Sequence, residues 1–137
     1  MAQVRPYRGV EAGERVAERR RRLIDAGLTV LGGSEAPAEL TVRAVCREAG
    51  LAARYFYEGF ADRDQFVGAV FDAVVADLAA TTQAAVAAAP PLEQNRASMA
   101  NVVRAIASDA RIGRLLFSAQ LPNGVVAAKR AESGVLL

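Results

Sequence analysis

The chain has 137 residues, of which 53% are apolar and 23% charged, a composition typical of one globular domain and too apolar for a disordered chain. It contains no histidine and one cysteine, Cys46, which excludes a Ser-His-Asp or Cys-His nucleophile, a histidine-ligated metal and an internal disulfide. Paired carboxylates at productive spacing and a G-x-x-x-x-G-K-[ST] phosphate loop are also missing. We therefore expect a protein that is not an enzyme and needs no cofactor. The lack of a disulfide framework favours the reducing cytoplasm.

Charge is distributed unevenly along the chain, although the net charge is only +2. Residues 1–22 carry seven arginines and three glutamates, whereas residues 64–137 carry six basic and six acidic side chains. The basic first segment lacks the apolar stretch of a signal peptide, and the most apolar run, 67–89, is interrupted by Asp72 and Asp77, which argues against a membrane span. A basic first part joined to a neutral body predicts a polyanionic partner for the first part alone.

The predicted elements of the first half are helices, since alternating or β-branched runs of strand length are absent. Apolar spacing predicts a first helix over 14–31, ended by Gly32-Gly33. After a polar linker at 34–40, Thr41 is a good N-cap for a short helix that ends before Gly50. A second short helix is predicted to begin at Ala53, three residues after Gly50, and to end before Gly59. Two short helices around a tight turn, preceded by a longer one, form the pattern of a helix-turn-helix.

A long helix is predicted next. Asp62 is its N-cap, with Gln65 three residues on completing a capping box, and the helix can run to Ala89. It is apolar on nearly all sides, which predicts that it is buried or shared with a partner.

The remaining elements are shorter. Pro90-Pro91 ends the long helix, and another is predicted over 92–108. A short helix over 109–118 and a turn at 122–124 follow, which leaves little room for a further long helix. The residues expected to point inward from the 92–108 helix are Met99, Val102, Val103 and Ile106.

The stretch TVRAVCREAGLAARYFYEGFADRDQF, residues 41–66, resembles the DNA-binding domain of the tetracycline-repressor (TetR) family, and the preceding RLIDAGL looks like that family's first helix. The combination of TV, AG, YFY and the F-x-D-R-D-x-F ending is more specific than a lone helix-turn-helix, and the resemblance covers roughly residues 15–70. It implies an all-α fold: a three-helix DNA-binding domain with a basic N-terminal arm over 1–67, followed over 68–137 by an incomplete helical domain for ligand binding and dimerisation.

The resemblance also implies contacts with the DNA backbone and bases around the first short helix. Thr41 matches a cap whose hydroxyl or amide meets a phosphate at the positive end of the helix. Arg43 matches a position that can reach a guanine edge, and Arg63 a position on phosphate. The basic run 19–22 is interpreted as a solvated helix face that partly touches DNA. Residues 5–8 are interpreted as a minor-groove arm or as a segment disordered without DNA.

The second short helix matches the recognition helix of the family. Ala53, Arg54 and Tyr55 open it and are expected to reach bases, and Tyr57 matches a tyrosine that contacts the DNA backbone; plain packing is the alternative for both tyrosines. The sequence departs from the family at two positions.

At Ala52, a Ser or Thr commonly caps the recognition helix, and at Gly59 a His or Asn is common. Both departures weaken the assignment of individual base contacts. Phe56 and Phe60 are expected to belong to the core, and Cys46 is expected to pack inward rather than to sense redox state.

The resemblance implies that the second domain binds a small hydrophobic ligand and that the full-length form is a homodimer. Family members are usually longer, so we expect the usual dimerising pair of helices to be missing and the dimer to be weak. Asp77 and Asn101 are candidates for orienting a ligand. Ordinary helix packing is the alternative for each residue of the possible ligand pocket, which comprises Phe71, Val74, Val75, Leu78, Met99, Val103, Ile106 and Phe117.

The expected function is therefore that of a cytoplasmic transcriptional regulator, a ligand-responsive repressor that binds a palindromic operator in double-stranded DNA and no membrane. The alternative is a helical protein–protein interaction module that docks through the apolar helix 66–78 and has no role with DNA. A salt-dependent shift of duplex DNA separates the two hypotheses.

Overall fold

The computed structural model describes residues 4–33, 40–118 and 123–136. Every regular element in these ranges is helical, which confirms the all-α prediction. Most of the expected linker at 34–40 and Pro122 of the expected turn lie outside the described residues. The elements are α1 (Val4–Gly32), α2 (Val42–Ala49), α3 (Ala53–Gly59), α4 (Arg63–Ala88), the 3-10 turn η1 (Pro91–Glu93), α5 (Gln94–Ser108), α6 (Ala110–Phe117) and α7 (Gly124–Leu136).

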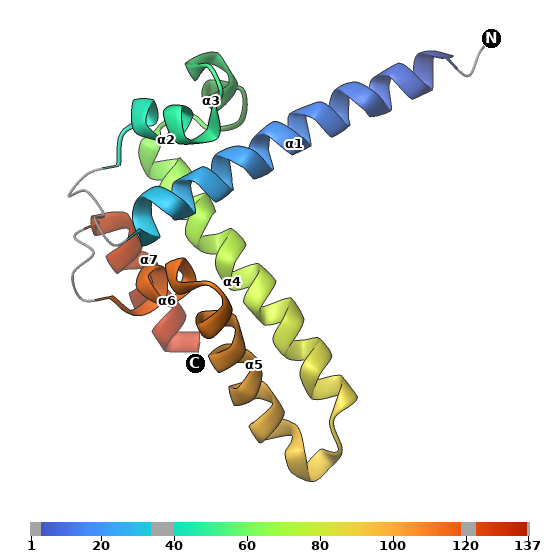
Figure 1. Cartoon of the computed structure of the whole chain (residues 1–137), viewed down its shortest axis with the longest axis vertical. Coiled ribbons are helices and arrows are strands. Elements are labelled where there is room, and N and C mark those ends of the chain that lie inside the picture. Colours follow the sequence, from blue (N-terminus) through green and yellow to red (C-terminus); the bar gives the residue numbers. More distant parts are fainter. Residues whose placement is uncertain (1–3, 34–39, 119–122, 137) are drawn as a thin grey trace.

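Helix α1 is ten residues longer at its start than predicted, because it begins at Val4 and not at residue 14. Residues 4–13 therefore continue the helix, and the expectation of an arm ahead of it is wrong for this segment. Pro6 lies in the first turn, where its missing N–H does no harm. The first half of α1 projects beyond the rest of the protein, past α3 (Figure 1), and Val10 is 57% exposed there.

Three predicted helix ends of the first half are confirmed, at Thr41, Gly50 and Asp62, whereas α3 includes Gly59 and does not end before it. The Thr41 hydroxyl accepts a hydrogen bond from the N–H of Ala44 at 3.1 Å, and Gly50 ends α2 in the left-handed region with φ 69°. Asp62 accepts from the N–H of Gln65 at 2.8 Å and so caps α4. The Gln65 side chain reaches the N–H of Ala61 at 2.6 Å, one residue earlier than a regular capping box requires.

One hydrophobic core joins both parts of the chain. Phe56 of α3, Phe66 of α4 and Leu23 of α1 are almost fully buried, and Leu115 of α6 and Val126 of α7 belong to the same cluster. Helix α4 crosses the expected domain boundary between residues 67 and 68 without a break. The helices of the first half are therefore held by packing against helices of the second half.

The rings of Phe56, Phe60 and Phe66 pack together with centroids 4.8–5.4 Å apart, which confirms that the first two belong to the core. Cys46 is buried beside them in the same cluster, and burial raises the pKa of its thiol, so the predicted packing role is confirmed. A thiol with a raised pKa is a poor redox sensor. Gly27 of α1 lies so close to Phe66 that a Cβ there would be 2.6 Å from the ring.

Helices α4 and α5 form a long hairpin that extends away from α1 (Figure 1). Its buried polar contact is made by the amide of Asn101, which donates to the hydroxyls of Thr81 and Thr82 at 2.9 and 2.8 Å. Pro91 opens η1, so the regular helix begins at Gln94 and not at residue 92. By length and composition α4 is also capable of crossing a membrane, but its first three turns pack in the protein core.

The prediction that Met99 and Val103 point inward is wrong. Met99 and Val103 are 64% and 62% exposed, not inward, because α5 packs on α4 through the side that carries the buried Asn101. The region after the turn forms α7 with 13 residues, where no further long helix was expected. Its first turn is capped by the Asn123 side chain, which accepts from the N–H groups of Val125 and Val126.

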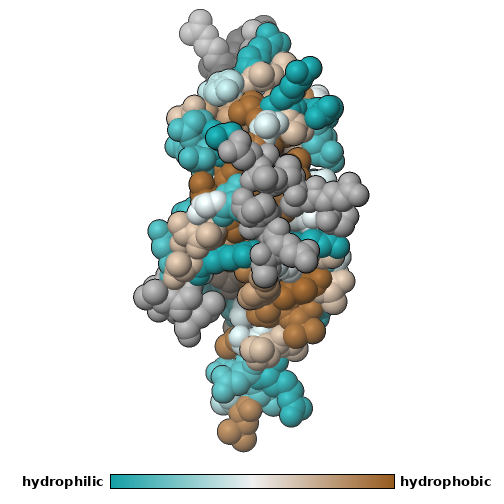
Figure 2. Space-filling model, turned by 90° about the vertical axis from the view of Figure 1, so that its left-hand side faces the viewer, coloured by the Kyte–Doolittle hydropathy of each residue, from teal (hydrophilic) through white to brown (hydrophobic). Residues whose placement is uncertain are grey.

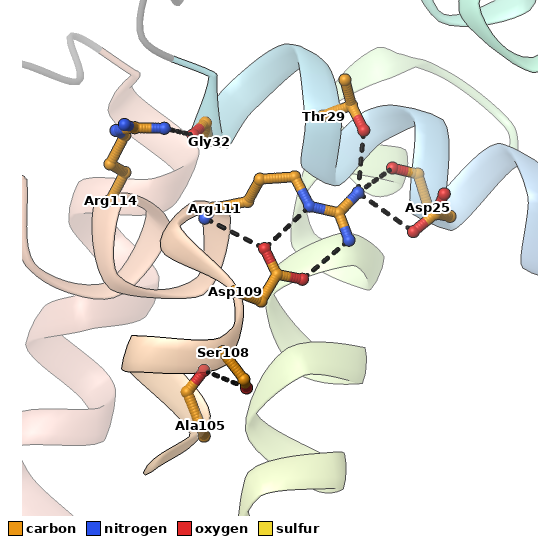
Figure 3. A network of polar contacts seen from close by, with 8 residues as sticks. All are labelled: Asp25, Thr29, Gly32, Ala105, Ser108, Asp109, Arg111 and Arg114. Atoms are coloured by element: carbon orange, nitrogen blue, oxygen red, sulfur yellow. Dashed lines mark hydrogen bonds and ion pairs between the residues drawn. The ribbon is translucent and has the colours of Figure 1, made fainter. Parts of the chain in front are cut away.

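The end of α1 is tied to α6 by Arg111, which lies between Asp25 of α1 and Asp109, the N-cap of α6 (Figure 3). Its guanidinium donates to Asp25 at 3.1 Å and to Thr29 at 2.8 Å in α1, and to Asp109 at 2.7 Å. The backbones also touch, because a Cβ on Gly32 would lie 2.5 Å from the carbonyl oxygen of Arg111. This contact fixes the angle between α1 and the second half of the chain.

The Arg111 contact predicts a pH-dependent component of stability. The hydrogen bond from Arg111 holds the pKa of Asp109 below its ordinary value, so this component is present above about pH 4 and disappears as the pH falls through the lowered pKa. We expect Asp109→Asn to lower the free energy of unfolding at pH 7 by about 1 kcal/mol, because the pair is partly exposed. The difference from the unmodified protein should vanish near pH 2 in urea titrations followed by circular dichroism.

Arg111→Gln is the matched control, since it removes the same hydrogen bond from the other partner. It should abolish the same acid-dependent component. A loss that is equal at all pH values in Asp109→Asn would contradict the assignment.

Candidate nucleic-acid interface

Helices α2 and α3 lie side by side against the second half of α1, at the end of the protein opposite the α4–α5 hairpin tip (Figure 1). The turn between them depends on Gly50, the one residue with positive φ among those described. Ala52 makes no side-chain cap for α3, as its apolar side chain predicted. Of the seven residues expected to contact DNA, Tyr55 is half-buried, and the exposed ones are Thr41, Arg43, Ala53, Arg54, Tyr57 and Arg63.

Three arginines on α2 and α3 are exposed and form no ion pair with any described residue. Arg43 and Arg47 stand four residues apart on one face of α2, and Arg54 stands in the first turn of α3. Arg47 was not among the predicted contact residues, although its spacing of four from Arg43 is a sequence signal that identifies it. Thr41, at the start of the same helix, uses its hydroxyl oxygen in capping and keeps the hydroxyl hydrogen to donate. These groups suit the recognition of an anion.

The basic run of α1 is exposed at Arg20, Arg21 and Arg22, and it also has a structural role. Arg22 donates to the carbonyl oxygen of Ala49 at 2.7 Å, and Arg20 donates to that of Gly59 at 3.3 Å while lying over the Phe60 ring. These carbonyls belong to the last residues of α2 and α3, which lack partners within their helices, and a cation is favourable there. Both arginines therefore hold the two short helices on α1 and also remain exposed, so the interpretation of the run as a solvated face is confirmed for them.

A cluster of charged and aromatic side chains joins α1 to α3 beside the first turn of α3. Arg19 pairs with Glu58 at 2.9 Å, and its guanidinium lies 4.6 Å from the centre of the Tyr55 ring. Arg54 lies 4.8 Å from the same ring centre and donates to the Tyr55 hydroxyl at 2.9 Å. Tyr55 is thus in contact with one neutralised arginine and one unpaired arginine.

The residues expected to line a ligand pocket do not share one environment. Phe71 and Val74 are buried in the core. Phe117 is 66% exposed, and Met99 and Val103 are exposed to a similar extent. Val75, Leu78 and Ile106 are half-buried. Of the two polar candidates, Asp77 is exposed on α4, while the amide of Asn101 is committed to the α4–α5 contact described above. Within the described ranges, no three metal-ligating side chains come together.

Comparison of the chain with protein-family models, with curated proteins and with solved structures found no match.

Proposed function

We propose that this protein is a DNA-binding transcriptional regulator of the TetR type, in which α2 and α3 act as a helix-turn-helix and α3 enters the major groove of an operator. The observation that carries the proposal is the set of unpaired arginines Arg43, Arg47 and Arg54, held on two exposed short helices that α1 fixes in place. Arginine is suited to phosphates and to guanine edges alike. A cytoplasmic, non-enzymatic repressor acting on a palindromic site as a homodimer is the simplest form of this function.

We infer that the second half responds to a small hydrophobic ligand. Support comes from the apolar character of the buried or half-buried candidates Phe71, Val74, Val75, Leu78 and Ile106. Such sites are mostly apolar with a few orienting polar groups. Met99, Val103 and Phe117 are exposed and do not belong to the proposed ligand site.

The alternative, a protein–protein interaction module, is favoured by a different observation. Met99 and Val103 are exposed one turn apart on α5, and Leu92 at the hairpin tip is fully exposed. Figure 2 shows hydrophobic surface on the lower half of the molecule, on the side where α5 lies. This surface is on α5 and η1, whereas the sequence predicted a docking surface on helix 66–78, whose first residues are buried in the core.

Titration of a labelled duplex pool at several salt concentrations tests the proposal. Binding that involves three or four phosphates should give a slope of about −3 in a plot of log affinity against log salt. Arg63→Ala should weaken all duplexes alike and flatten the slope by about one, whereas Arg43→Ala should relax preference at one base pair by roughly 1–3 kcal/mol. Equal losses on specific and random DNA in both variants would contradict this division of roles. The interaction module, by contrast, binds no duplex even at low salt.

A further inference from the structure

The contacts of Tyr55 set Arg54 apart from the other two unpaired arginines. Arg43 and Arg47 have no hydrogen-bonding or aromatic partner for their guanidinium groups among the described residues, whereas that of Arg54 is held by both the ring and the hydroxyl of its neighbour. The Tyr55 ring is itself fixed, being half-buried between α3 and Arg19 of α1. The side chain in the first turn of α3 therefore has a preferred orientation before any partner arrives.

The charges in this cluster are arranged so that one of the two arginines stays free. The carboxylate of Glu58 accepts two bonds from Arg19 Nη2, at 2.9 and 3.2 Å, and one from Nε at 3.3 Å, which neutralises that guanidinium. The side chains of this pair are 23% and 35% exposed. Arg54 forms no ion pair with a described residue, so its positive charge is available to a ligand. Arg19, although it belongs to the basic run of α1, adds little positive charge to the interface.

We propose that Tyr55 is a positioning residue, which orients the guanidinium of Arg54 to read a guanine edge and makes Arg54 the main determinant of sequence preference. This inference rests on the proposed DNA-binding function. The Tyr55 hydroxyl occupies one of the five N–H donors of Arg54, so the remaining donors can pair with the two acceptors of guanine in the major groove. Tyr55 then acts through Arg54 and does not itself contact a base.

The physical reason for an effect on preference is the entropy of a long side chain. A free arginine loses its rotamer freedom when it is fixed against a base, and an arginine that is already oriented loses less. This advantage applies only where the fixed orientation matches the base, because a phosphate accepts a guanidinium from many directions. Removing the Tyr55 hydroxyl should therefore reduce selectivity and leave the bulk electrostatic attraction unchanged.

The experiment begins with the full chain and a pool of duplexes that have a randomised central segment. A preferred duplex is selected with the unmodified protein, and the ratio of its affinity to that of the random pool defines the preference. Tyr55→Phe should lower this ratio about three- to tenfold, with an unchanged salt slope. Arg54→Ala should lower it by about five- to a hundredfold, and Arg54→Lys should also lower it, since the lysine ammonium lacks the planar fork that Tyr55 orients.

The double variant Tyr55→Phe/Arg54→Ala provides the decisive comparison. If Tyr55 acts only through Arg54, the double variant should have the same preference as Arg54→Ala alone. Thermal unfolding of each variant separates a loss of selectivity from a loss of fold, and the exposed Arg54 variants should keep the midpoint of the unmodified protein.

Three outcomes would overturn the inference while leaving the proposed function intact. These are full preference in Tyr55→Phe, an additive loss in the double variant, or a slope that flattens by about one in Arg54→Ala without loss of preference, the mark of a phosphate contact. If no duplex is enriched and the random pool is not bound at low salt, the proposed function itself fails.

Discussion

Replacement of Phe66 with alanine should lower the free energy of unfolding by about 3–5 kcal/mol, the range for truncation of a fully buried aromatic side chain. Phe66 has no exposed surface, its ring packs on Phe56 and Phe60, and it lies against Gly27 of α1. The alanine variant leaves a cavity where α1, α3 and α4 meet, and these helices hold the candidate interface. Urea unfolding followed by circular dichroism measures the loss, and duplex binding should fall with it.

The close fit between Phe66 and Gly27 offers a second, opposite test at the same place. In Gly27→Ala the new methyl group would lie 2.6 Å from the Phe66 ring and 2.8 Å from Val70, so we expect a net loss of about 1–3 kcal/mol despite the better helix propensity of alanine. The loss should be smaller in a Phe66→Leu background, because the ring atoms that meet the methyl group are gone.

Gly13→Ala is the matched control in the same helix, since nothing lies within 4 Å of a Cβ there. It should leave stability unchanged or raise it by up to about 1 kcal/mol. If Gly27→Ala behaves like Gly13→Ala, the contact between α1 and α4 is looser than described.

The triple variant Arg43→Ala/Arg47→Ala/Arg54→Ala should lose the greatest part of duplex binding. Arg43 and Arg54 are expected to read base edges and Arg47 to neutralise a phosphate, so the slope should fall by about one unit and the affinity for the preferred duplex at low salt by two or more orders of magnitude. The three side chains are exposed and bear no described ion pair, so helix content and thermal midpoint should be unchanged. Anisotropy of a labelled duplex measures binding.

A control of similar charge is available far from the candidate interface. Arg96 and Arg104 are exposed on α5, and replacing both with alanine removes two positive charges from the other end of the protein. This double variant should bind duplex DNA with the slope of the unmodified protein. A comparable loss in the double and the triple variant would mean that net charge, and not the α2–α3 surface, drives binding.

Local features of the sequence determined the helices and most of their ends. Thr41, Gly50 and Asp62 act through atoms within a few residues of themselves, so a hydroxyl, a carboxylate or a missing Cβ at the right place is sufficient to cap or stop a helix. The start of α1 was missed because residues 4–13 carry neither an apolar stripe nor a cap, and the helix continues there without either signal. The residues of α2 and α3 were expected in two short helices and lie in them.

Tertiary structure alone decided which side chains are free at the surface. Arg20 and Arg43 are the same residue type with the same intrinsic charge, yet one is bound to the end of α3 and the other is unpaired. Met99 and Val103 show the same dependence, since a helix with apolar residues on several sides buries the side that its neighbour covers. In each case a residue distant in the sequence determines whether the side chain is bound or exposed, and the local periodicity contains no information about that residue. The residue types of α2 and α3 therefore determine that the candidate interface is basic, and the packing of α1 determines which of its arginines are unpaired.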